Sequence, residues 1–277
     1  MIPGAELCEE LAWDSAFFGV SIARARTSCL DESICSALLE WCGSRGIDCL
    51  YFLCPIGDAP TQRLLTDHAF QSVGVRVTLS RSSAESDGGR VSGQFRPATV
   101  DDIPRLRAIA LASHRDTRFH ADGHFDPARC DELYATWIEK SVQGYATSVV
   151  VADRDGAAVG YITLHLDAHD PPALTLREPQ GDPEPSRGVS ERLRVEGPAA
   201  GTARIGLFAV DERWRGQGIG RDLLRHAAQV LLEQGVVDTS VVTPGSNTGA
   251  LKLYKSAGFR TTDVSLWYHR WFSHERR

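Results

Sequence analysis

A strand, a glycine-rich loop and a helix follow one another between residues 205 and 234, and this order constrains the fold more than any other part of the chain. Residues 205–210 are an apolar run of the kind that forms a buried strand. The loop after them has glycine at every second position from Gly216 to Gly220. An amphipathic helix is predicted over 221–234. Such a loop directs several backbone N–H groups at a helix N-terminus, whose partial positive charge favours an anion such as a pyrophosphate.

Two common phosphate-binding loops do not match this segment. The dinucleotide fingerprint G-x-G-x-x-G requires glycine at 221 or 223, where the chain has Arg221 and Leu223. A Walker A loop ends in Gly-Lys-Ser or Gly-Lys-Thr, and neither tripeptide occurs. The segment instead resembles the Arg/Gln-x-x-Gly-x-Gly/Ala signature of the GCN5-related N-acetyltransferase (GNAT) superfamily, through Arg215, Gly218 and Gly220. That resemblance implies acetyl-CoA as co-substrate, with its pyrophosphate in the loop.

The residues after the loop extend the resemblance. A strand is predicted over 236–243, followed by a short helix that runs from about Ala250 through Tyr254 to Gly258-Phe259. A β-rich segment is predicted over 264–272. Asn247 and Tyr254 stand where the superfamily has a cofactor-contacting asparagine and a frequent catalytic tyrosine. The implied fold is the α/β GNAT fold, a mixed, splayed β-sheet with flanking helices. The implied cofactor-binding residues are Phe208, Ala209, Val210, Arg215, Gly216, Gln217, Gly218, Ile219, Gly220 and Asn247.

The composition argues against several other classes of protein. A formal net charge of −6 gives no support for nucleic-acid binding. No apolar run is long enough to span a membrane and the N-terminus has no signal-peptide pattern, so we expect a soluble, cytoplasmic protein without a membrane partner. The seven cysteines include no C-x-x-C pair. We therefore expect buried thiols in a reducing compartment and no metal site.

The length of 277 residues predicts a second unit beside the acetyltransferase domain. Residues 83–93 are small, polar and glycine-rich, which is typical of a linker. Before them, an extended segment (11–27), two helices (31–44 and 61–69) and two strands (47–54 and 73–81) predict an N-terminal α/β domain over 1–82. Its end, from Leu65 to Phe70, parallels the stretch from Tyr254 to Phe259. We interpret this domain as a degenerate half-GNAT that cannot hold acetyl-CoA.

The acetyltransferase domain is predicted over 94–277. Helices are expected from about residue 101 and around Leu133 to Ile138, with a loop over 116–126 between them. Asp155 and Gly156 indicate a hairpin between two strands. Residues 167–200 contain six prolines and no helical or alternating pattern, so they predict a flexible insertion. A plain surface loop, a lid over the acceptor site and an oligomer contact are the alternatives for this insertion.

A closer resemblance involves three stretches: residues 11–20, the segment from Ser113 to His120, and residues 134–139. They are similar to the dTDP-fucosamine acetyltransferase family, whose members carry an N-terminal α/β part ahead of the acetyltransferase domain. This resemblance implies transfer of acetyl from acetyl-CoA to the 4-amino group of a nucleotide-linked aminodeoxysugar. The insertion at 167–200 departs from the family pattern and leaves the acceptor sugar open.

The chemistry of acyl transfer suggests roles for a few residues. The strand before the loop is expected to splay from its neighbour and to offer free backbone groups at Phe208 and Val210, one of them polarising the thioester carbonyl. A neutral amine attacks directly, and Tyr254 is the candidate general acid for the departing thiolate. The alternative for Tyr254 is a packed core tyrosine. No acid lies within 205–210, so the base stays open, with His165 and Glu139 as possible relays.

The acceptor amine is the part that the sequence specifies least. Arg118 and His120 are candidate substrate contacts, and solvated loop residues are the alternative. Besides a dTDP-linked sugar, an antibiotic or a polyamine is a possible acceptor, and a non-catalytic acyl-CoA-binding protein is the alternative from another class. The C-terminal strands could also pair two chains into a homodimer.

Overall fold

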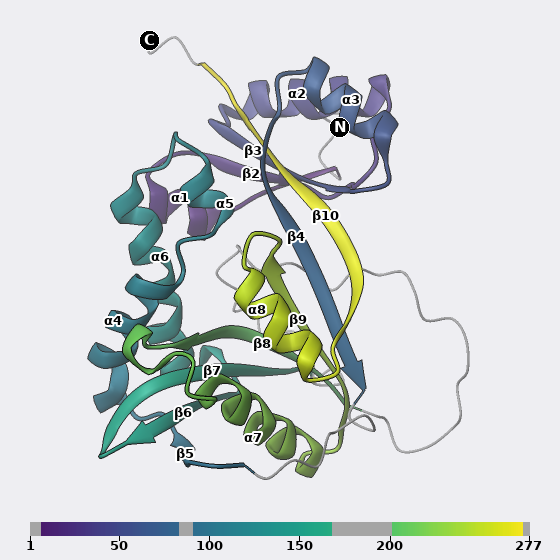
Figure 1. Ribbon diagram of the computed structural model, residues 1–277. Coiled ribbons are helices and arrows are strands. Elements are labelled where there is room, and N and C mark those ends of the chain that lie inside the picture. Colours follow the sequence, from purple (N-terminus) through teal and green to yellow (C-terminus); the bar gives the residue numbers. More distant parts are fainter. Residues whose placement is uncertain (1–6, 83–90, 168–200, 274–277) are drawn as a thin grey trace.

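The computed structural model describes residues 7–82, 91–167 and 201–273, which build one mixed sheet with helices on both faces (Figure 1). The order along the sheet is β1-β2-β3-β10-β4-β9-β8-β7-β6-β5. The pairs β2·β3 and β8·β9 are parallel, and the other neighbours are antiparallel. The strands are β1 (Cys8–Glu10), β2 (Ile22–Ala25), β3 (Cys49–Pro55), β4 (Gln71–Ser82), β5 (Gln94–Pro97), β6 (Ser148–Arg154), β7 (Ala157–Asp167), β8 (Gly201–Val210), β9 (Val236–Pro244) and β10 (Arg260–Trp271).

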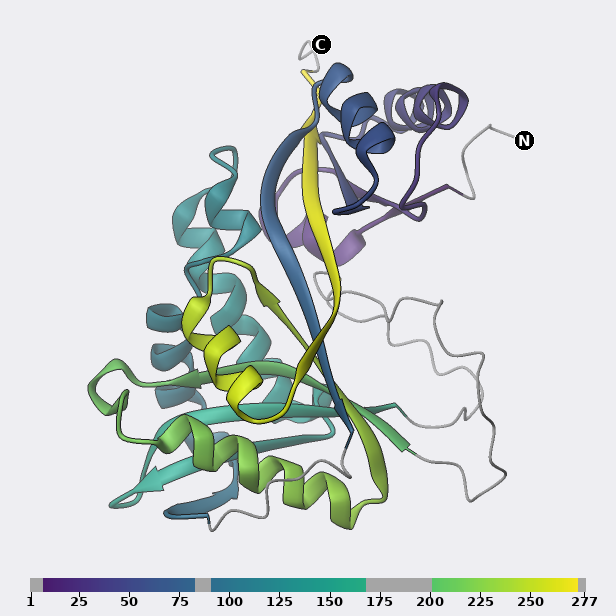
Figure 2. The same ribbon diagram turned by 45° about the vertical axis from the view of Figure 1, so that its right-hand side comes forward.

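The helices divide between the two faces of this sheet, as Figures 1 and 2 show. Successive side chains along a strand point to opposite faces of the sheet and so contribute to two cores. Tyr161 packs in the core on the α4 side, whereas Ile162 packs in the core on the α7 side. One face carries α1, α4, α5 and α6, and the other carries α2, α3, α7 and α8. The helices are α1 (Ala12–Phe18), α2 (Glu32–Arg45), α3 (Ala59–Asp67), α4 (Ile103–Ser113), α5 (Arg118–Ala121), α6 (Pro127–Lys140), α7 (Ile219–Glu233) and α8 (Thr248–Ser256).

Two stretches of the chain have the same order of elements and exchange one strand each. The first runs β2-α2-β3-α3-β4 and the second runs β8-α7-β9-α8-β10. The N-terminal β4 lies between β9 and β10, while the C-terminal β10 lies between β3 and β4. The predicted segments 1–82 and 94–277 therefore share one sheet. Their division into two domains, and the half-GNAT interpretation of the first, stay predictions.

Most predicted elements are present, with two local errors. The segment 11–27, expected to be extended, contains helix α1, which ends where Gly19 adopts a left-handed φ of 73°. The loop expected over 116–126 contains α5, whose first turn is capped by the Thr117 hydroxyl accepting from the His120 N–H. Both helices are short, with apolar side chains packed into the core, so no helical period emerges from the sequence. The hairpin at Asp155 and Gly156 is confirmed, since both residues have positive φ as a type I′ turn requires.

The predicted linker and insertion lie mostly outside the described residues: 83–90 of the linker and 168–200 of the insertion. The described part of the chain contains no helix long and apolar enough to cross a membrane. All seven cysteines are free thiols, and only Cys29 is exposed. Six buried thiols agree with the expectation drawn from the sequence.

Candidate functional site

Strands β8 and β9 separate halfway along their length, which opens the sheet. Their parallel pairing ends at Ile205 and Val241. Directly after this pair, β8 bulges against β7: the Leu207 N–H donates to Thr163 Oγ1 at 2.7 Å, and the register shifts between Ile162 and Leu164. The bulge favours glycine at its first position, because a Cβ on Gly206 would lie 2.7 Å from Thr163 Oγ1 and from His165 Nε2 and would displace these side chains. The predicted splay is therefore present, and a bulge marks its start.

The open edge of β8 carries backbone groups that pair with no strand of the described ranges. The Asp211 N–H donates to the Val159 carbonyl at 2.9 Å, which fixes the phase of the antiparallel β7·β8 ladder. Because hydrogen-bonded pairs alternate in such a ladder, Ala209 turns its N–H and C=O toward β7, while Phe208 and Val210 turn theirs toward the splay. The strand therefore presents N–H donors to a ligand that enters between β8 and β9.

The glycine loop and α7 follow this open edge. Gly216 and Gly218 have φ of +76° and +83°, a left-handed conformation that favours glycine. Nothing lies within 4 Å of a Cβ built on either residue, so backbone conformation rather than crowding demands the glycines. Gly218 is the N-cap of α7 and offers no side chain to the N–H groups of the first turn. These N–H groups are therefore left for an anionic ligand.

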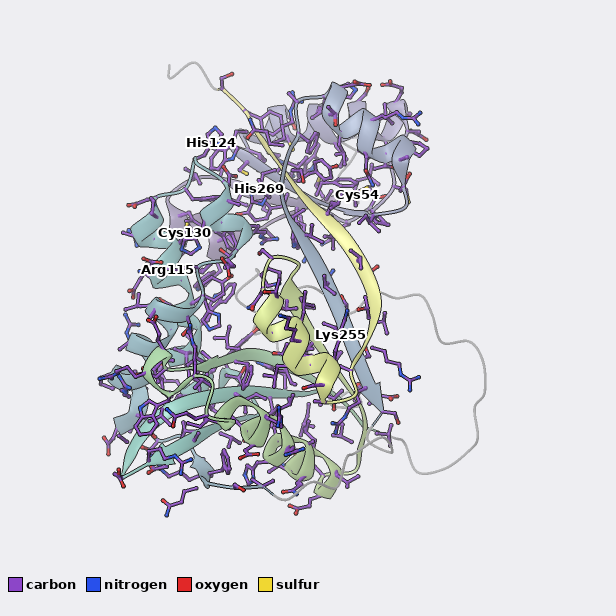
Figure 3. The ribbon with its side chains drawn as sticks, in the orientation of Figure 1. Cys54, Arg115, His124, Cys130, Lys255 and His269 are labelled. Atoms are coloured by element: carbon purple, nitrogen blue, oxygen red, sulfur yellow. The ribbon has the colours of Figure 1, made fainter. Side chains whose placement is uncertain are left out.

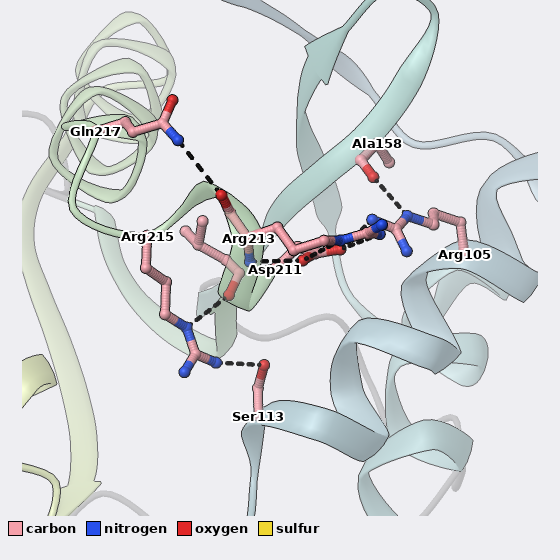
Figure 4. Close-up of polar contacts among 8 residues, drawn as sticks. Arg105, Ser113, Ala158, Asp211, Arg213, Arg215 and Gln217 are labelled. Carbon is pink, nitrogen blue, oxygen red and sulfur yellow. Dashed lines mark hydrogen bonds and ion pairs between the residues drawn. The ribbon is translucent and has the colours of Figure 1, made fainter.

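Arg215 joins the loop to the neighbouring elements (Figure 4). Its Nε donates to the Val210 carbonyl at 3.0 Å, and its Nη2 donates to Ser113 Oγ at the end of α4 at 3.0 Å. Gln217 Nε2 donates to the Arg213 carbonyl at 3.4 Å. The start of the loop is anchored by Asp211, which accepts from Arg105 and from Arg213. The loop thus has a fixed base and an arginine at its edge.

A cavity of about 600 Å³ begins at the splay and continues to the N-terminal elements. Its walls come from both sides of the splay, from the α4–α5 connection, from β4 and from β10. The connection is the segment that the resemblance to the sugar-nucleotide enzymes singled out. Predicted site residues that line the cavity are Phe208, Asn247, Tyr254, Arg118 and His120. Residues 215–220 are not among its described lining residues, so the glycine loop and this cavity are distinct parts of the site.

Tyr254 is buried in α8, with 3% of its surface exposed. Its ring lies 6.1 Å from Phe208 and 5.6 Å from Phe259, and it belongs to the core on this face. Burial raises the pKa of Tyr254 above its ordinary value, so the phenol stays protonated at neutral pH. A protonated hydroxyl in a cavity wall is available to give up a proton.

Asn247 is the N-cap of α8. Its Oδ1 accepts from the Ala250 N–H at 3.0 Å. Because the oxygen is used by the cap, the amide NH₂ is the part left to donate to a ligand. The cap thereby fixes the orientation of the amide in the cavity wall.

Arg118 and His120 differ in availability. Both ring nitrogens of His120 are engaged, Nδ1 with Thr117 Oγ1 at 2.8 Å and Nε2 with Asp131 Oδ1 at 3.0 Å. Arg118 lies among aromatic rings, and its Nη1 is buried without a hydrogen-bond partner in the described chain. Of the two predicted acceptor contacts, Arg118 has the unused donor.

Several cavity residues were not predicted from the sequence. His114 contacts the Tyr161 hydroxyl through Nε2 at 2.9 Å and stacks on Tyr134. Burial lowers the pKa of His114 to about 4, and the charge of Arg215 contributes, so the imidazole is neutral. Arg76 on β4 and Arg204 on β8 add positive charge. His114 lies within the stretch that the family resemblance marked, whereas no sequence signal brings Arg76 to this cavity.

The two candidate proton relays, Glu139 and His165, have different surroundings. Glu139 Oε2 accepts from Arg107 at 2.5 Å on the outer side of α4 and α6. His165 lies against Gly206 and the ring of Tyr145. No group of His, Cys, Asp and Glu that could hold a metal ion occurs in the described ranges.

Comparison with known proteins agrees with this geometry. Residues 112–259 match the model of the "Acetyltransferase (GNAT) family". The chain is 29% identical over 266 residues to a dTDP-fucosamine acetyltransferase of Escherichia coli O6:H1, covering 95% of this chain and 97% of that protein. It is 23% identical over 224 residues to a mycothiol acetyltransferase of Clavibacter sepedonicus, covering 77% of this chain and 60% of that protein.

A solved GCN5-related N-acetyltransferase from Sphaerobacter thermophilus superposes with a TM-score of 0.55 at 14% identity, over 91% of this chain and 72% of that one. The same fold thus extends across the N-terminal elements and the acetyltransferase part. Since the matched family model spans more than half of the 277 residues, the chain belongs to the GNAT family and is an acetyl-CoA-dependent N-acetyltransferase.

Proposed function

We propose that this enzyme acetylates the 4-amino group of a dTDP-linked aminodeoxysugar, with Tyr254 as general acid. The observation that carries the proposal is the charge of the acceptor cavity. Of the lining residues that the structure describes, four are arginines (Arg76, Arg115, Arg118 and Arg204) and one is a carboxylate, Asp116. The chain as a whole has a net charge of −6, so this cavity has the opposite sign to the rest of the molecule. Such a lining attracts an anionic acceptor and disfavours a polycation.

The relative named dTDP-fucosamine acetyltransferase supports the same choice. The similarity covers 95% of this chain, including the N-terminal elements that contribute cavity residues such as Val73 and Arg76. A nucleotide sugar carries a diphosphate between its sugar and its nucleoside, and arginine is well suited to contact phosphate oxygens. An aminoglycoside or a polyamine would bring further positive charge among the four arginines.

The glycine loop and the open edge of β8 are assigned to acetyl-CoA. The N–H groups after Gly218 and the Arg215 guanidinium bind its pyrophosphate, and the backbone of Phe208 and Val210 binds the pantetheine arm. When bound, acetyl-CoA supplies the acetyl group as a thioester. An N–H on the open edge of β8 stabilises the negative charge that develops on the thioester oxygen. The Asn247 amide gives a further donor from the opposite side of the splay.

Tyr254 donates its proton to the departing thiolate. The phenol carries its proton at neutral pH, and its place in the wall beside Phe208 puts it near the open edge of β8. The neutral amine attacks directly, and its nitrogen forms the bond to the acetyl carbon as the C–S bond breaks. The proton that the nitrogen then loses passes to solvent, from which the Tyr254 phenolate regains a proton. His114 is neutral, and its Nε2 contacts the Tyr161 hydroxyl in the wall of the same cavity.

Steady-state acetylation of a panel of amines tests the proposal. The panel contains dTDP-4-amino-4,6-dideoxygalactose, kanamycin and spermidine, each with acetyl-CoA, and the readouts are thiol release and the mass of the product. We expect turnover of the nucleotide sugar with product acetylated at N4. Efficient acetylation of kanamycin or spermidine, with none of the nucleotide sugar, would contradict the proposal.

A further inference from the structure

Arg118 is a buried charge in the wall of the acceptor cavity, held among three aromatic rings. Only 9% of the residue is exposed. Its guanidinium carbon lies 3.9 Å from the ring centre of Trp267, 4.5 Å from that of Phe119 and 4.6 Å from that of Tyr51. The faces of aromatic rings attract a cation but accept no N–H in the way an oxygen does. The rings therefore hold the guanidinium in place and leave its donors for another partner.

One donor of this guanidinium is unused. Nη1 is buried and has no hydrogen-bond partner among the residues that the structure describes. Asp14 on α1 is near enough to act on Arg118 electrostatically, but both of its carboxylate oxygens also lack a hydrogen-bond partner there. A buried charged donor without a partner is costly. An anionic group that enters the cavity would remove this cost.

The surroundings of Arg118 are rigid and come from distant parts of the chain. Tyr51 belongs to β3 and stacks on His269 of β10 at 4.4 Å. His269 Nδ1 in turn contacts Asp122 Oδ2 at 2.6 Å, just after α5. Figure 3 labels His269 where β10 passes the helices on this side of the sheet. The guanidinium is thus positioned before any ligand arrives, which lowers the entropic cost of binding.

We propose that Arg118 is a preformed receptor for a phosphoryl group of the acceptor substrate. The planar guanidinium donates to phosphate oxygens in a fixed fork geometry, and Arg76 and Arg204 in the same cavity add positive charge. The receptor is separate from the pyrophosphate site of the glycine loop. It makes the N-terminal elements part of the acceptor site, because β3 supplies Tyr51. The inference rests on the proposed function only for the identity of the acceptor.

Binding of dTDP to the chain saturated with CoA tests this receptor, since CoA fills the anion site of the glycine loop beforehand. Isothermal titration calorimetry gives the Kd of dTDP for wild type and for Arg118→Gln. We expect the substitution to weaken dTDP binding by about 10- to 100-fold, the usual effect of losing a hydrogen bond to a charged group, without changing CoA binding. Inorganic pyrophosphate should compete with dTDP, whereas thymidine should bind much more weakly than dTDP.

Arg270→Gln is the matched control. Arg270 also packs on aromatic rings, at 5.0 Å from Phe272 and 5.7 Å from Phe70, and it has a buried Nε without a partner in the described chain. It does not belong to the described lining of the cavity. Its substitution should leave the Kd of dTDP unchanged.

A second variant guards against misfolding. Arg118→Gln leaves the Asp14 carboxyl group buried beside a neutral side chain, whereas Asp14→Asn with Arg118→Gln removes both charges together. Thermal unfolding shows which variant keeps the fold, and that variant is used for titration. The same loss of dTDP affinity in the double variant supports the receptor.

Three results would overturn the receptor: equal dTDP affinity in wild type and the folded variant, no dTDP binding by the CoA-saturated wild type, or thymidine binding as tightly as dTDP. The acetylation panel tests the proposed function independently of this binding experiment. Binding of dTDP that depends on Arg118, together with no acetylation of the amino sugar, would keep the receptor and remove the acceptor assignment. Acetylation of the amino sugar, together with dTDP binding that does not depend on Arg118, would keep the acceptor assignment and remove the receptor.

Discussion

The ring of Tyr254 lies 6.1 Å from the ring of Phe208, so the proposed proton donor on α8 faces the strand whose free backbone groups line the splay. The two residues come from elements on opposite sides of the opening between β8 and β9. Their proximity depends on the separation of these strands after Ile205 and Val241. The site is therefore a consequence of how the sheet opens.

Tyr254→Phe removes the phenolic hydroxyl with little change in packing. We expect kcat to fall by about 100-fold or more, the usual scale for a general acid, with little change in the Kd of acetyl-CoA. Stopped-flow or steady-state kinetics and calorimetry measure the two quantities. Tyr268→Phe is the control, because Tyr268 is a buried tyrosine in the N-terminal core, away from the cavity. Near wild-type turnover of Tyr254→Phe would remove Tyr254 from the mechanism.

Gly218→Ala places a side chain on a residue with φ of +83°. A left-handed conformation costs a residue with a Cβ roughly 1–2 kcal/mol, so the loop should shift and its N–H groups should lose their common direction. We expect the Kd of acetyl-CoA to rise by roughly 5- to 30-fold, which is that energy expressed as a change in affinity. Gly43→Ala is the control, since this glycine lies inside α2 without positive φ and with open space around it. Unchanged affinity in Gly218→Ala would show that the loop does not bind the cofactor.

The chain should bind one acetyl-CoA, although two of its parts share an order of elements. Helix α2 holds the place of α7 in the N-terminal stretch, but its N-cap is Asp31, whose Oδ1 accepts from the Ile34 N–H at 2.8 Å. A carboxylate already occupies the anion-binding end of α2, whereas Gly218 leaves the end of α7 open. Calorimetry should give a stoichiometry near one acetyl-CoA per chain, and Gly218→Ala should weaken binding at that one site. Two equivalent binding events would contradict this account of the N-terminal stretch.

The buried pair of His269 and Asp122 predicts an acid-sensitive fold. Burial lowers the pKa of His269 to about 4, although the hydrogen bond to Asp122 favours the charged imidazole. Burial alone raises the pKa of Asp122, but hydrogen bonds from His269, Trp271 and His124 outweigh it and hold this pKa far below the ordinary value. Between about pH 6.5 and pH 4, His269 is protonated in the unfolded state but neutral in the folded state. The free energy of unfolding therefore falls as pH falls from 6.5 toward 4.

His269→Asn tests this linkage, because asparagine can donate to Asp122 but does not titrate. Chemical unfolding between pH 4 and 8 should show a pH slope that is shallower in the variant, by at most about 1.4 kcal/mol per pH unit over the range 4 to 6.5. The difference in the free energy of unfolding between the two proteins at pH 8, where the histidine is neutral in both states, gives the effect of the changed packing alone. Equal slopes in both proteins would show that His269 does not carry the effect.

The glycine loop and its flanking elements could be predicted from sequence because their signals are local. The predicted strand 205–210 and helix 221–234 are present as β8 and α7, within a few residues at their ends. The Asn247 cap of α8 is local in the same sense, because a capping residue acts within one helical turn. Each of these features depends on residues that are close in the chain.

The acceptor cavity could be predicted only in part. Arg118 and His120 were found because they lie in one short segment. Arg76 and Trp267 reach the same cavity because β4 enters between β9 and β10, which is a long-range pairing that no local pattern reveals. Helix α1 was missed for a related reason, since its seven residues are helical through packing against α6 rather than through a visible period.

In the proposed function, the enzyme recognises an amine through the phosphoryl groups attached to it. The most direct test compares kcat/KM for dTDP-4-amino-4,6-dideoxygalactose with kcat/KM for the methyl glycoside of the same amino sugar, at saturating acetyl-CoA. We expect the nucleotide sugar to be preferred by at least about 100-fold, the scale of two or more charge-assisted hydrogen bonds. Equal values, or a preference for the uncharged glycoside, would contradict the account.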